Sequence, residues 1–363
     1  MAKGLLPLCV YVFFRVIEDE APKEFYNPRA NSRQSPFRMV ESIIEVFFDT
    51  VFADLERDGL AKRYKRRCIA DYLSTIISAS EGSKCEDNCA LAVTSAVRVH
   101  SIAKADNGQI CPLGKHHNVL YVAAKLSFDW RLSDSQVIAA MLKQIFDCEK
   151  TFERIVIAAI LGPLVTRLLS GWQADYQDEQ ESLNALDYYL QHATTERQTY
   201  KISGCNLRMV DVPMPAYHDA LPAHLACVMD RPTALLLLLR HGARLGPGEH
   251  GVWTQGASPV ALVQQLLRLH EIMQSGGSVP SAAIDCLRLI MRALPHAALG
   301  DERLRETAEI VLPKTRWAEP PELKHIARCA VRRELGRGWS LPDGIEKLNV
   351  PSTLKPYLDL MED

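Results

Sequence analysis

Between residues 36 and 200, apolar positions recur with the three-to-four-residue period of amphipathic α-helices. Ser35 and Pro36 suit the cap and first turn of the first helix, which we expect to end near Gly59. Breaks containing glycine separate the segments and no strand-like alternation competes, so antiparallel helix pairs are expected, in a solenoid or in an irregular bundle. The predicted helices span residues 36–59, 60–80, 88–104, 117–127, 134–147, 151–170 and 180–197.

A different signature appears at residues 221–243. Leu-Pro-Ala-His-Leu-Ala-Cys opens it, an apolar run follows at 235–239, and Arg-His-Gly-Ala closes it. This order resembles an ankyrin repeat, in which a T-P-L-H-x-A helix start precedes a second helix. Gly242 suits the left-handed residue that ends such a helix, and Leu221 stands where threonine is usual. We expect His224 to make a structural hydrogen bond within the turn, not to act in catalysis.

A poorer copy of this repeat begins at residues 258–262 and resumes at 284–294. Pro222 and Pro259 are 37 residues apart, against a nominal repeat of about 33. The spacing predicts an insertion in the Gly-rich stretch at 246–253. Two imperfect repeats are too few to be stable alone, so the N-terminal helices or the C-terminal segment must cover their ends.

The C-terminal segment, residues 320–361, combines a short amphipathic helix with an apolar stretch that contains prolines. Pro320 and Pro321 suit a helix start, and Gly336 and Gly338 suit its end. One face of this helix is apolar, while Arg328, Arg332 and Arg333 lie on the other side. The apolar face carries Leu323, Ile326, Ala327, Ala330 and Val331, and the later stretch carries Leu348, Val350, Pro351, Leu354, Tyr357 and Leu358. Such a segment is too short to bury itself and needs a partner surface.

This arrangement resembles a SOCS box, the module by which substrate receptors engage the elongin B/C adaptor and a cullin. The resemblance implies that Leu323 enters an apolar pocket on elongin C, with Ala327 standing where cysteine is usual. In the second half the family usually reads Leu-Pro-aliphatic-Pro, and Asn349 replaces the first proline, which bears on cullin binding more than on elongin binding. The implied elongin contacts are Leu323, Ile326, Ala327 and Val331, and the implied cullin contacts are Leu348, Val350, Pro351, Leu354, Tyr357 and Leu358.

Composition is that of a globular protein. The chain has 363 residues, 47% of them hydrophobic and 24% charged, with 42 basic against 44 acidic residues. This near-neutral balance argues against nucleic acid as a main partner. The ten cysteines are scattered, which favours reduced thiols in the cytoplasm, with the nucleus left open. The apolar run at residues 4–14 lacks a cleavage pattern and is too short to span a bilayer, so we interpret it as a buried segment and expect no membrane association.

Candidate chemistry is sparse. Gly246, Gly248 and Gly251 match G-x-G-x-x-G, but the pattern follows a helix instead of a strand, which indicates a loop. The basic run at residues 62–67 would point all around a helix, which favours a solvated helix start. Soft zinc ligands are present, yet their spacing fits no recognised knuckle and we interpret them as unligated, with no metal and no cofactor. Those ligands are Cys85, Cys89, Cys111, His116 and His117.

Together these features resemble the ankyrin repeat and SOCS box family. We predict an all-α chain with a helical region at 1–200, degenerate ankyrin-like repeats at 201–314 and a SOCS box at 315–363. The resemblance implies a non-catalytic substrate-recognition adaptor that joins an unknown protein substrate to elongin B/C, cullin 5 and a RING protein. A helical scaffold that recruits no ligase is the alternative. A third, weaker hypothesis is a zinc-dependent enzyme in the N-terminal half.

Overall fold

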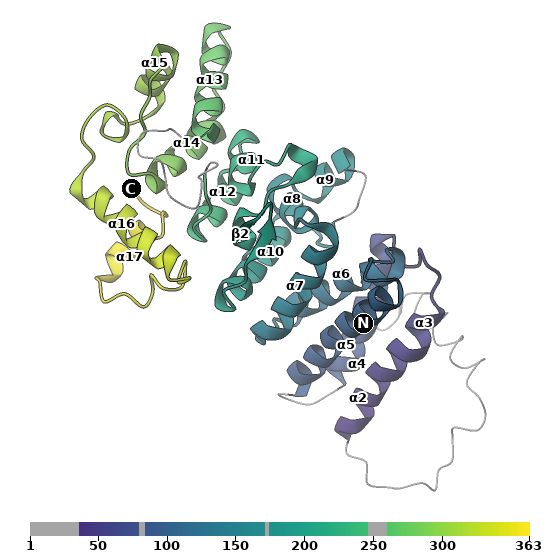
Figure 1. Cartoon of the computed structure of the whole chain (residues 1–363). Helices are drawn as coiled ribbons and strands as arrows, with labels where there is room; N and C mark the ends of the chain where they lie inside the picture. Colours follow the sequence, from purple (N-terminus) through teal and green to yellow (C-terminus); the bar gives the residue numbers. More distant parts are fainter. Residues whose placement is uncertain (1–35, 80–83, 171–173, 246–259) are drawn as a thin grey trace, which may run out of the picture. The chain divides into compact units, whose positions relative to one another are not determined.

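The chain is described by a computed structural model over residues 36–79, 84–170, 174–245 and 260–363. Helices dominate this part of the chain, which confirms the all-α prediction (Figure 1). Two compact units are present, Met1–Gln144 and Ile145–Asp363, and the division falls inside one helix. None of the helices in the described ranges is long and apolar enough to cross a membrane. The segments at 4–14 and 246–253, and the start of the second repeat at 258–259, lie outside the described residues.

The first unit is built from helices packed on an aromatic core. Phe47 lies edge-on to Phe48, with ring centroids 5.1 Å apart, and also contacts Tyr72 at 5.5 Å. Helix α6 packs on both α4 and α5, as the pattern of helix pairs predicted. The elements are α2 (Pro36–Val46), the π-helical turn η1 (Phe47–Val51), α3 (Phe52–Asp54), α4 (Arg63–Ser78), α5 (Lys84–Asp106), α6 (Gly114–Asp129) and the start of α7 (Ser135–Glu149).

A buried lysine, Lys115, binds the C-terminal end of α3. The Nζ atom of Lys115 donates to the carbonyl oxygens of Phe52, Ala53 and Leu55 at 3.1, 2.6 and 2.6 Å. The carbonyls of Ala53 and Leu55 lie at the C-terminal end of α3, where an ammonium group satisfies carbonyl acceptors and interacts favourably with the helix dipole. Burial lowers the pKa of Lys115. Lys115 therefore ties the start of α6 to the end of α3.

The basic run at 62–67 does not form one face, as predicted. Arg66 is buried and donates to the carbonyl oxygens of Leu60 and Ala61 at 3.0 and 2.9 Å. Arg67 is exposed, and Ile69 and Leu73 point into the core.

The second unit contains stacked helix pairs. The predicted helix at 151–170 is two helices, because Gly162 has φ +78° and Pro163 begins a new one. A short hairpin follows α10, with Tyr200 paired to Leu207 and Ile202 to Cys205. The elements are α8 (Glu153–Leu161), α9 (Pro163–Ser170), α10 (Glu179–Thr195), β1 (Tyr200–Ile202), β2 (Cys205–Leu207), α11 (Pro222–Val228), α12 (Pro232–Arg240), α13 (Val260–Gln274), α14 (Ser281–Ala293), α15 (Glu302–Val311), α16 (Leu323–Arg337) and α17 (Lys355–Leu358). Short 3-10 turns lie at Met209–Asp211, Pro215–Tyr217, Lys314–Arg316 and Ser352–Leu354.

The ankyrin-like signature corresponds to two stacked pairs. Helix α11 packs on α12 and on α13, and α12 packs on α14, so equivalent helices of the two pairs lie against each other. Helices α8 and α10 pack beside the first pair, while α15 packs on α13. Neighbours on both sides therefore supply the burial that two repeats lack by themselves.

The structure confirms the prediction for Gly242 and gives His224 a different partner. Gly242 has φ +76°, which confirms the left-handed helix end. His224 makes its hydrogen bond elsewhere than predicted, because its Nε2 atom lies 2.7 Å from Oε1 of Gln264 on α13. The bond joins one repeat to the next instead of tightening the turn.

Candidate functional site: the C-terminal helix and the turns that follow it

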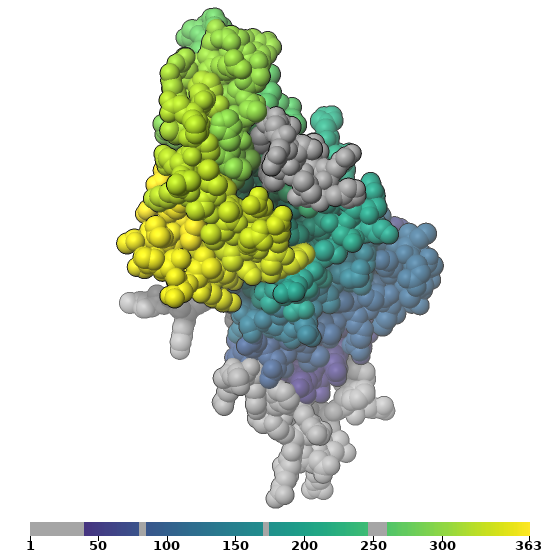
Figure 2. Space-filling model, turned by 60° about the vertical axis from the view of Figure 1, so that its left-hand side comes forward, coloured from purple at the N-terminus to yellow at the C-terminus, as the bar shows by residue number. Residues whose placement is uncertain are grey.

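Helix α16 begins and ends where the sequence places its breakers. Pro320 and Pro321 precede it, and Glu322 has extended backbone angles. At the other end, the N–H of Gly338 donates to the carbonyl of Glu334 at 3.0 Å, and Trp339 turns the chain with φ +57°. The segment that follows returns along α16, so residues 319–363 form one small layer on the upstream helices. Figure 2 shows this layer in yellow against the green helices of the second unit.

The two faces of α16 are inverted relative to an ordinary surface helix. Leu323 is 85% exposed and Ile326 is 41% exposed, and Ala327 is exposed beside them. His325 and Arg328, on the opposite face, are 0% exposed. Surface helices normally bury their apolar stripe and expose their charges. The apolar face of α16 is therefore left for another surface.

A histidine and an arginine form the centre of the buried face. The Nε2–H of His325 donates to the carbonyl of Leu294 at 2.7 Å, and its Nδ1 accepts from Arg328 Nη2 at 2.9 Å. Arg328 also donates to the carbonyl of Glu362 at 3.0 Å, and its guanidinium lies 4.1 Å from the centre of the Tyr357 ring. Burial lowers the pKa of His325, which keeps the imidazole neutral and able to accept.

Arg332 extends this buried face toward α12. Its guanidinium donates to the carbonyls of Leu358, at 2.9 Å, and of Leu239 and Arg240. Burial lowers the pKa of Arg332 to about 10, so the side chain stays charged at neutral pH. Asp359 lies 3.9 Å from Arg332 and accepts from Arg240 at 2.7 Å. Buried guanidinium groups thus satisfy carbonyl groups from segments far apart in the sequence.

The second half of the segment has a core of its own. Leu341, Ile345, Tyr357 and Leu358 are buried together, and Val331, Leu335, Leu348 and Val350 pack against them. Pro351 and Leu354 are exposed, as is Asn349. Of the predicted cullin contacts, Pro351 and Leu354 therefore lie on the surface and Leu348 and Val350 are half-buried. Tyr357 and Leu358 lie inside and support that surface.

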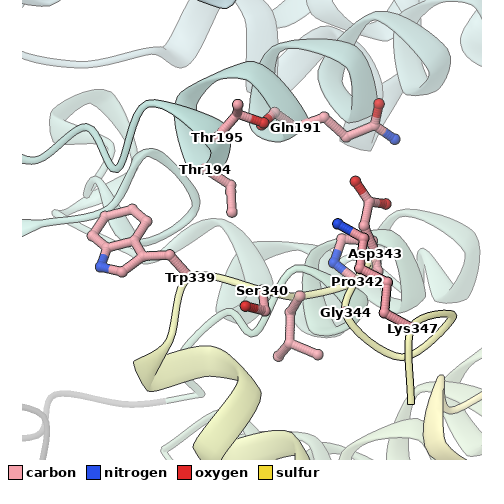
Figure 3. Close-up of a pocket in the computed structure, with 10 residues that line it drawn as sticks. Gln191, Thr194, Thr195, Trp339, Ser340, Pro342, Asp343, Gly344 and Lys347 are labelled. Atoms are coloured by element: carbon pink, nitrogen blue, oxygen red, sulfur yellow. The ribbon is translucent and has the colours of Figure 1, made fainter. Parts of the chain in front are cut away.

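A shallow pocket lies where this segment meets α10 (Figure 3). The turn at residues 340–344, which lines this pocket, is tight. A Cβ on Gly344 would lie 2.5 Å from the carbonyl oxygen of Ser340, so a side chain does not fit at this position. The lining combines the last turn of α10 with the turn after α16. The lining residues are Gln191, Thr194, Thr195, Trp339, Ser340, Leu341, Pro342, Asp343, Gly344 and Lys347.

The buried arginines were not predicted as structural residues, although the sequence placed them opposite the apolar stripe. His325, Arg328 and Arg332 are spaced i, i+3 and i+7, which indicates that their side chains share one face of the helix. The same spacing is also typical of a charged face in contact with solvent. The carbonyl partners that distinguish the two cases belong to other segments and cannot be found from the sequence of the helix.

The soft side chains considered from the sequence as zinc ligands, and interpreted as unligated, do not all lie together in the structure. Cys89 is buried on its own helix, with its Sγ 3.9 Å from the carbonyl of Leu126, and burial raises its pKa to about 12. Cys111 and His117 do come together, at 3.6 Å. Cys85 is half-exposed on α5, and a His116 ring contact is made with Phe52.

Comparisons with known proteins give a family match in the C-terminal segment and a group of relatives that share one name. The family model described as SOCS box matches residues 319–359. A protein of Canis lupus familiaris named Ankyrin repeat and SOCS box protein 17 is 41% identical over 126 residues, which is 31% of this chain and 43% of the relative. The Homo sapiens protein of that name is 43% identical over 49 residues, covering 14% of this chain and 17% of the relative. The matched part spans less than half of the length of these relatives. No solved structure matches the chain.

Residues 319–359 are thus a SOCS box, formed by α16, α17 and the turns between them. With this box and the stacked helix pairs upstream, the chain is similar to the ankyrin repeat and SOCS box proteins. Both relatives named above carry the name Ankyrin repeat and SOCS box protein 17.

Proposed function

We propose that this chain is a non-catalytic substrate-recognition adaptor of an elongin B/C–cullin 5 type ubiquitin ligase. The SOCS box would bind elongin C, the following turns would face the cullin, and the upstream helix pairs would hold a protein substrate. Ubiquitin transfer would belong to the partner RING protein and its conjugating enzyme. We place this assembly in the cytoplasm, with access to the nucleus left open.

The inverted faces of α16 carry the proposal. Exposing Leu323 and Ile326 to water costs free energy that a partner surface recovers, at about 1.5–3 kcal/mol for a fully buried leucine. Because His325, Arg328 and Arg332 hold the other face, α16 cannot turn its apolar stripe inward without leaving buried polar groups unpaired. The stripe is therefore presented in a fixed orientation. Preorganisation of this kind lowers the cost of binding.

The exposure of side chains on α16 supports the proposed elongin contacts. Leu323 is the anchor, with Ile326 and Ala327 beside it. Val331 is half-buried against the core of the box, so it shapes the lower edge of the patch. Ala327 is smaller than the cysteine usual in the family, so the contact is expected to survive with less buried area.

The cullin-facing edge is assigned to the exposed turn after residue 347. Leu348, Val350, Pro351 and Leu354 supply its surface, and buried Tyr357 and Leu358 hold that turn in place. Asn349 projects from the same turn.

The test is co-purification of elongin B/C with the full-length chain. Leu323→Asp is expected to abolish recovery, because a carboxylate would have to enter an apolar pocket. The matched control is Ile310→Asp on α15, where an isoleucine that is 70% exposed lies outside the box. Loss with the first variant and full recovery with the second is the expected result. Unchanged recovery with Leu323→Asp would overturn the elongin assignment and leave a helical scaffold as the better description.

A further inference from the structure

Two histidines and a cysteine converge in the first unit, away from the SOCS box. His100 lies near the end of α5, Cys111 in the connection to α6, and His117 in the first turn of α6. The Sγ atom of Cys111 lies 3.6 Å from Nε2 of His100 and 3.6 Å from Nδ1 of His117. His100 and His117 are 0% and 6% exposed, and Cys111 is half-buried.

These two separations match the edges of a metal tetrahedron. Zn²⁺ binds sulfur at about 2.3 Å and imidazole nitrogen at about 2.0–2.1 Å, which places the two ligand atoms about 3.6 Å apart at the tetrahedral angle. A cation shared by the three side chains would account for both separations. The ligand atoms of all three side chains lie within 4.8 Å of one another.

The ligand chemistry also fits. Imidazole and thiolate are the donors that zinc takes in structural sites. A ligating imidazole is neutral and a ligating cysteine is a thiolate, so zinc binding would release the thiol proton. His117 is held from behind by an edge-on contact with Tyr121, whose ring centroid is 5.8 Å away. The His117 ring is therefore oriented in the absence of a metal ion.

We propose that His100, Cys111 and His117 bind one Zn²⁺ that fastens the connection between α5 and α6. The ion would hold in place a connection whose Ile110 and Leu113 are 69% and 58% exposed. Its role is structural, and it does not depend on ligase recruitment.

The first test is the zinc content of the full-length chain, purified without an immobilised-metal step and measured by plasma mass spectrometry. About one zinc per chain is expected. Cys111→Ser and His117→Gln should each lower the content at least tenfold. Cys85→Ser and His116→Gln are matched controls that change the same residue types nearby and should retain the zinc. Zinc-free wild-type protein, or zinc retained in Cys111→Ser, would overturn the proposal.

A second test does not depend on the variants folding. Co²⁺ titrated into the metal-stripped wild-type chain should give the visible bands of a tetrahedral site and a thiolate-to-metal charge-transfer band. A charge-transfer intensity typical of one thiolate is expected, from Cys111, and supports the site. Absence of both features would exclude a tetrahedral thiolate-containing centre.

Discussion

The guanidinium of Arg328 lies 4.1 Å from the centre of the Tyr357 ring, with the side chains of both residues buried. This pair joins α16 to the end of the chain. On the other face of the helix, Leu323 stays in water. The orientation of α16, and with it the exposure of the apolar stripe, thus depends on a charged residue inside the protein.

Replacing Arg328 should destabilise the box. Arg328→Ala removes the donor to His325 Nδ1 and to the carbonyl of Glu362, as well as the ring contact with Tyr357. Because buried acceptors would lose a charged partner, the free energy of unfolding is expected to fall by about 2–4 kcal/mol. Chemical denaturation of the full-length chain measures this change.

Arg333→Ala is the matched control for that measurement. Arg333 is exposed on the same helix, so the free energy of unfolding should change by less than about 0.5 kcal/mol. Equal effects of the two substitutions would contradict a structural role specific to Arg328.

Acidification should weaken the contact between His325 and Arg328. Burial lowers the pKa of His325 below its usual 6.5, with Arg316 and Arg328 acting in the same direction and Glu322 and the Leu294 carbonyl opposing them. Below pH 6.5 the unfolded chain therefore binds a proton that the folded chain does not. Stability is expected to be fully present above that pH and to fall as the pH drops toward the folded pKa.

His325→Gln provides the comparison for the pH series. Its amide nitrogen can donate to the Leu294 carbonyl and its amide oxygen can accept from Arg328, without titrating. The difference in unfolding free energy between wild type and this variant should change between pH 7.5 and pH 5.5. A constant difference would show that protonation of His325 does not contribute.

We expect residue 349 to affect the proposed affinity for cullin 5. In its turn the backbone hydrogen bonds are donated by Leu348 and Val350 and not by Asn349, so proline at 349 removes none of them. Asn349→Pro would restrict the free chain and should tighten binding of cullin 5 by about two- to fivefold. Calorimetric titration of the elongin-bound complex measures the affinity.

Asn349→Ala separates the two effects of that substitution. It removes the amide without fixing φ, so it should leave the affinity close to that of the wild type. Tightening by alanine as well as by proline would mean that the asparagine side chain itself opposes the cullin. Unchanged affinity with proline would mean that the position is not in contact.

Local sequence determined most of the helices because their signals lie within a few residues of one another. The start at Pro36, the helix end at Gly242 and the start of α16 after Pro320 and Pro321 all follow from backbone preferences. Two elements were missed. Helix α15 was missed although Leu304, Ala308 and Val311 recur at helical spacing, since charged residues fill most of its other positions, and each strand of the hairpin at 200–207 is too short to show alternation.

Side-chain partners from distant segments were not predictable in the same way. His224 was expected to bond within its own turn, but Gln264 of the next repeat is its partner. Similarly, Cys111 and His117 are close in sequence, whereas the arrival of His100 depends on how α5 packs against α6.

The sequence by itself determined that one face of residues 323–331 is apolar and that its residues match a SOCS box, because helical periodicity is a local property. Only the tertiary structure decided which face is buried. Arg328 and Arg332 turn inward because carbonyl groups of Leu239, Leu358 and Glu362 meet there and need donors. Satisfying those buried groups fixes the helix and leaves Leu323 exposed.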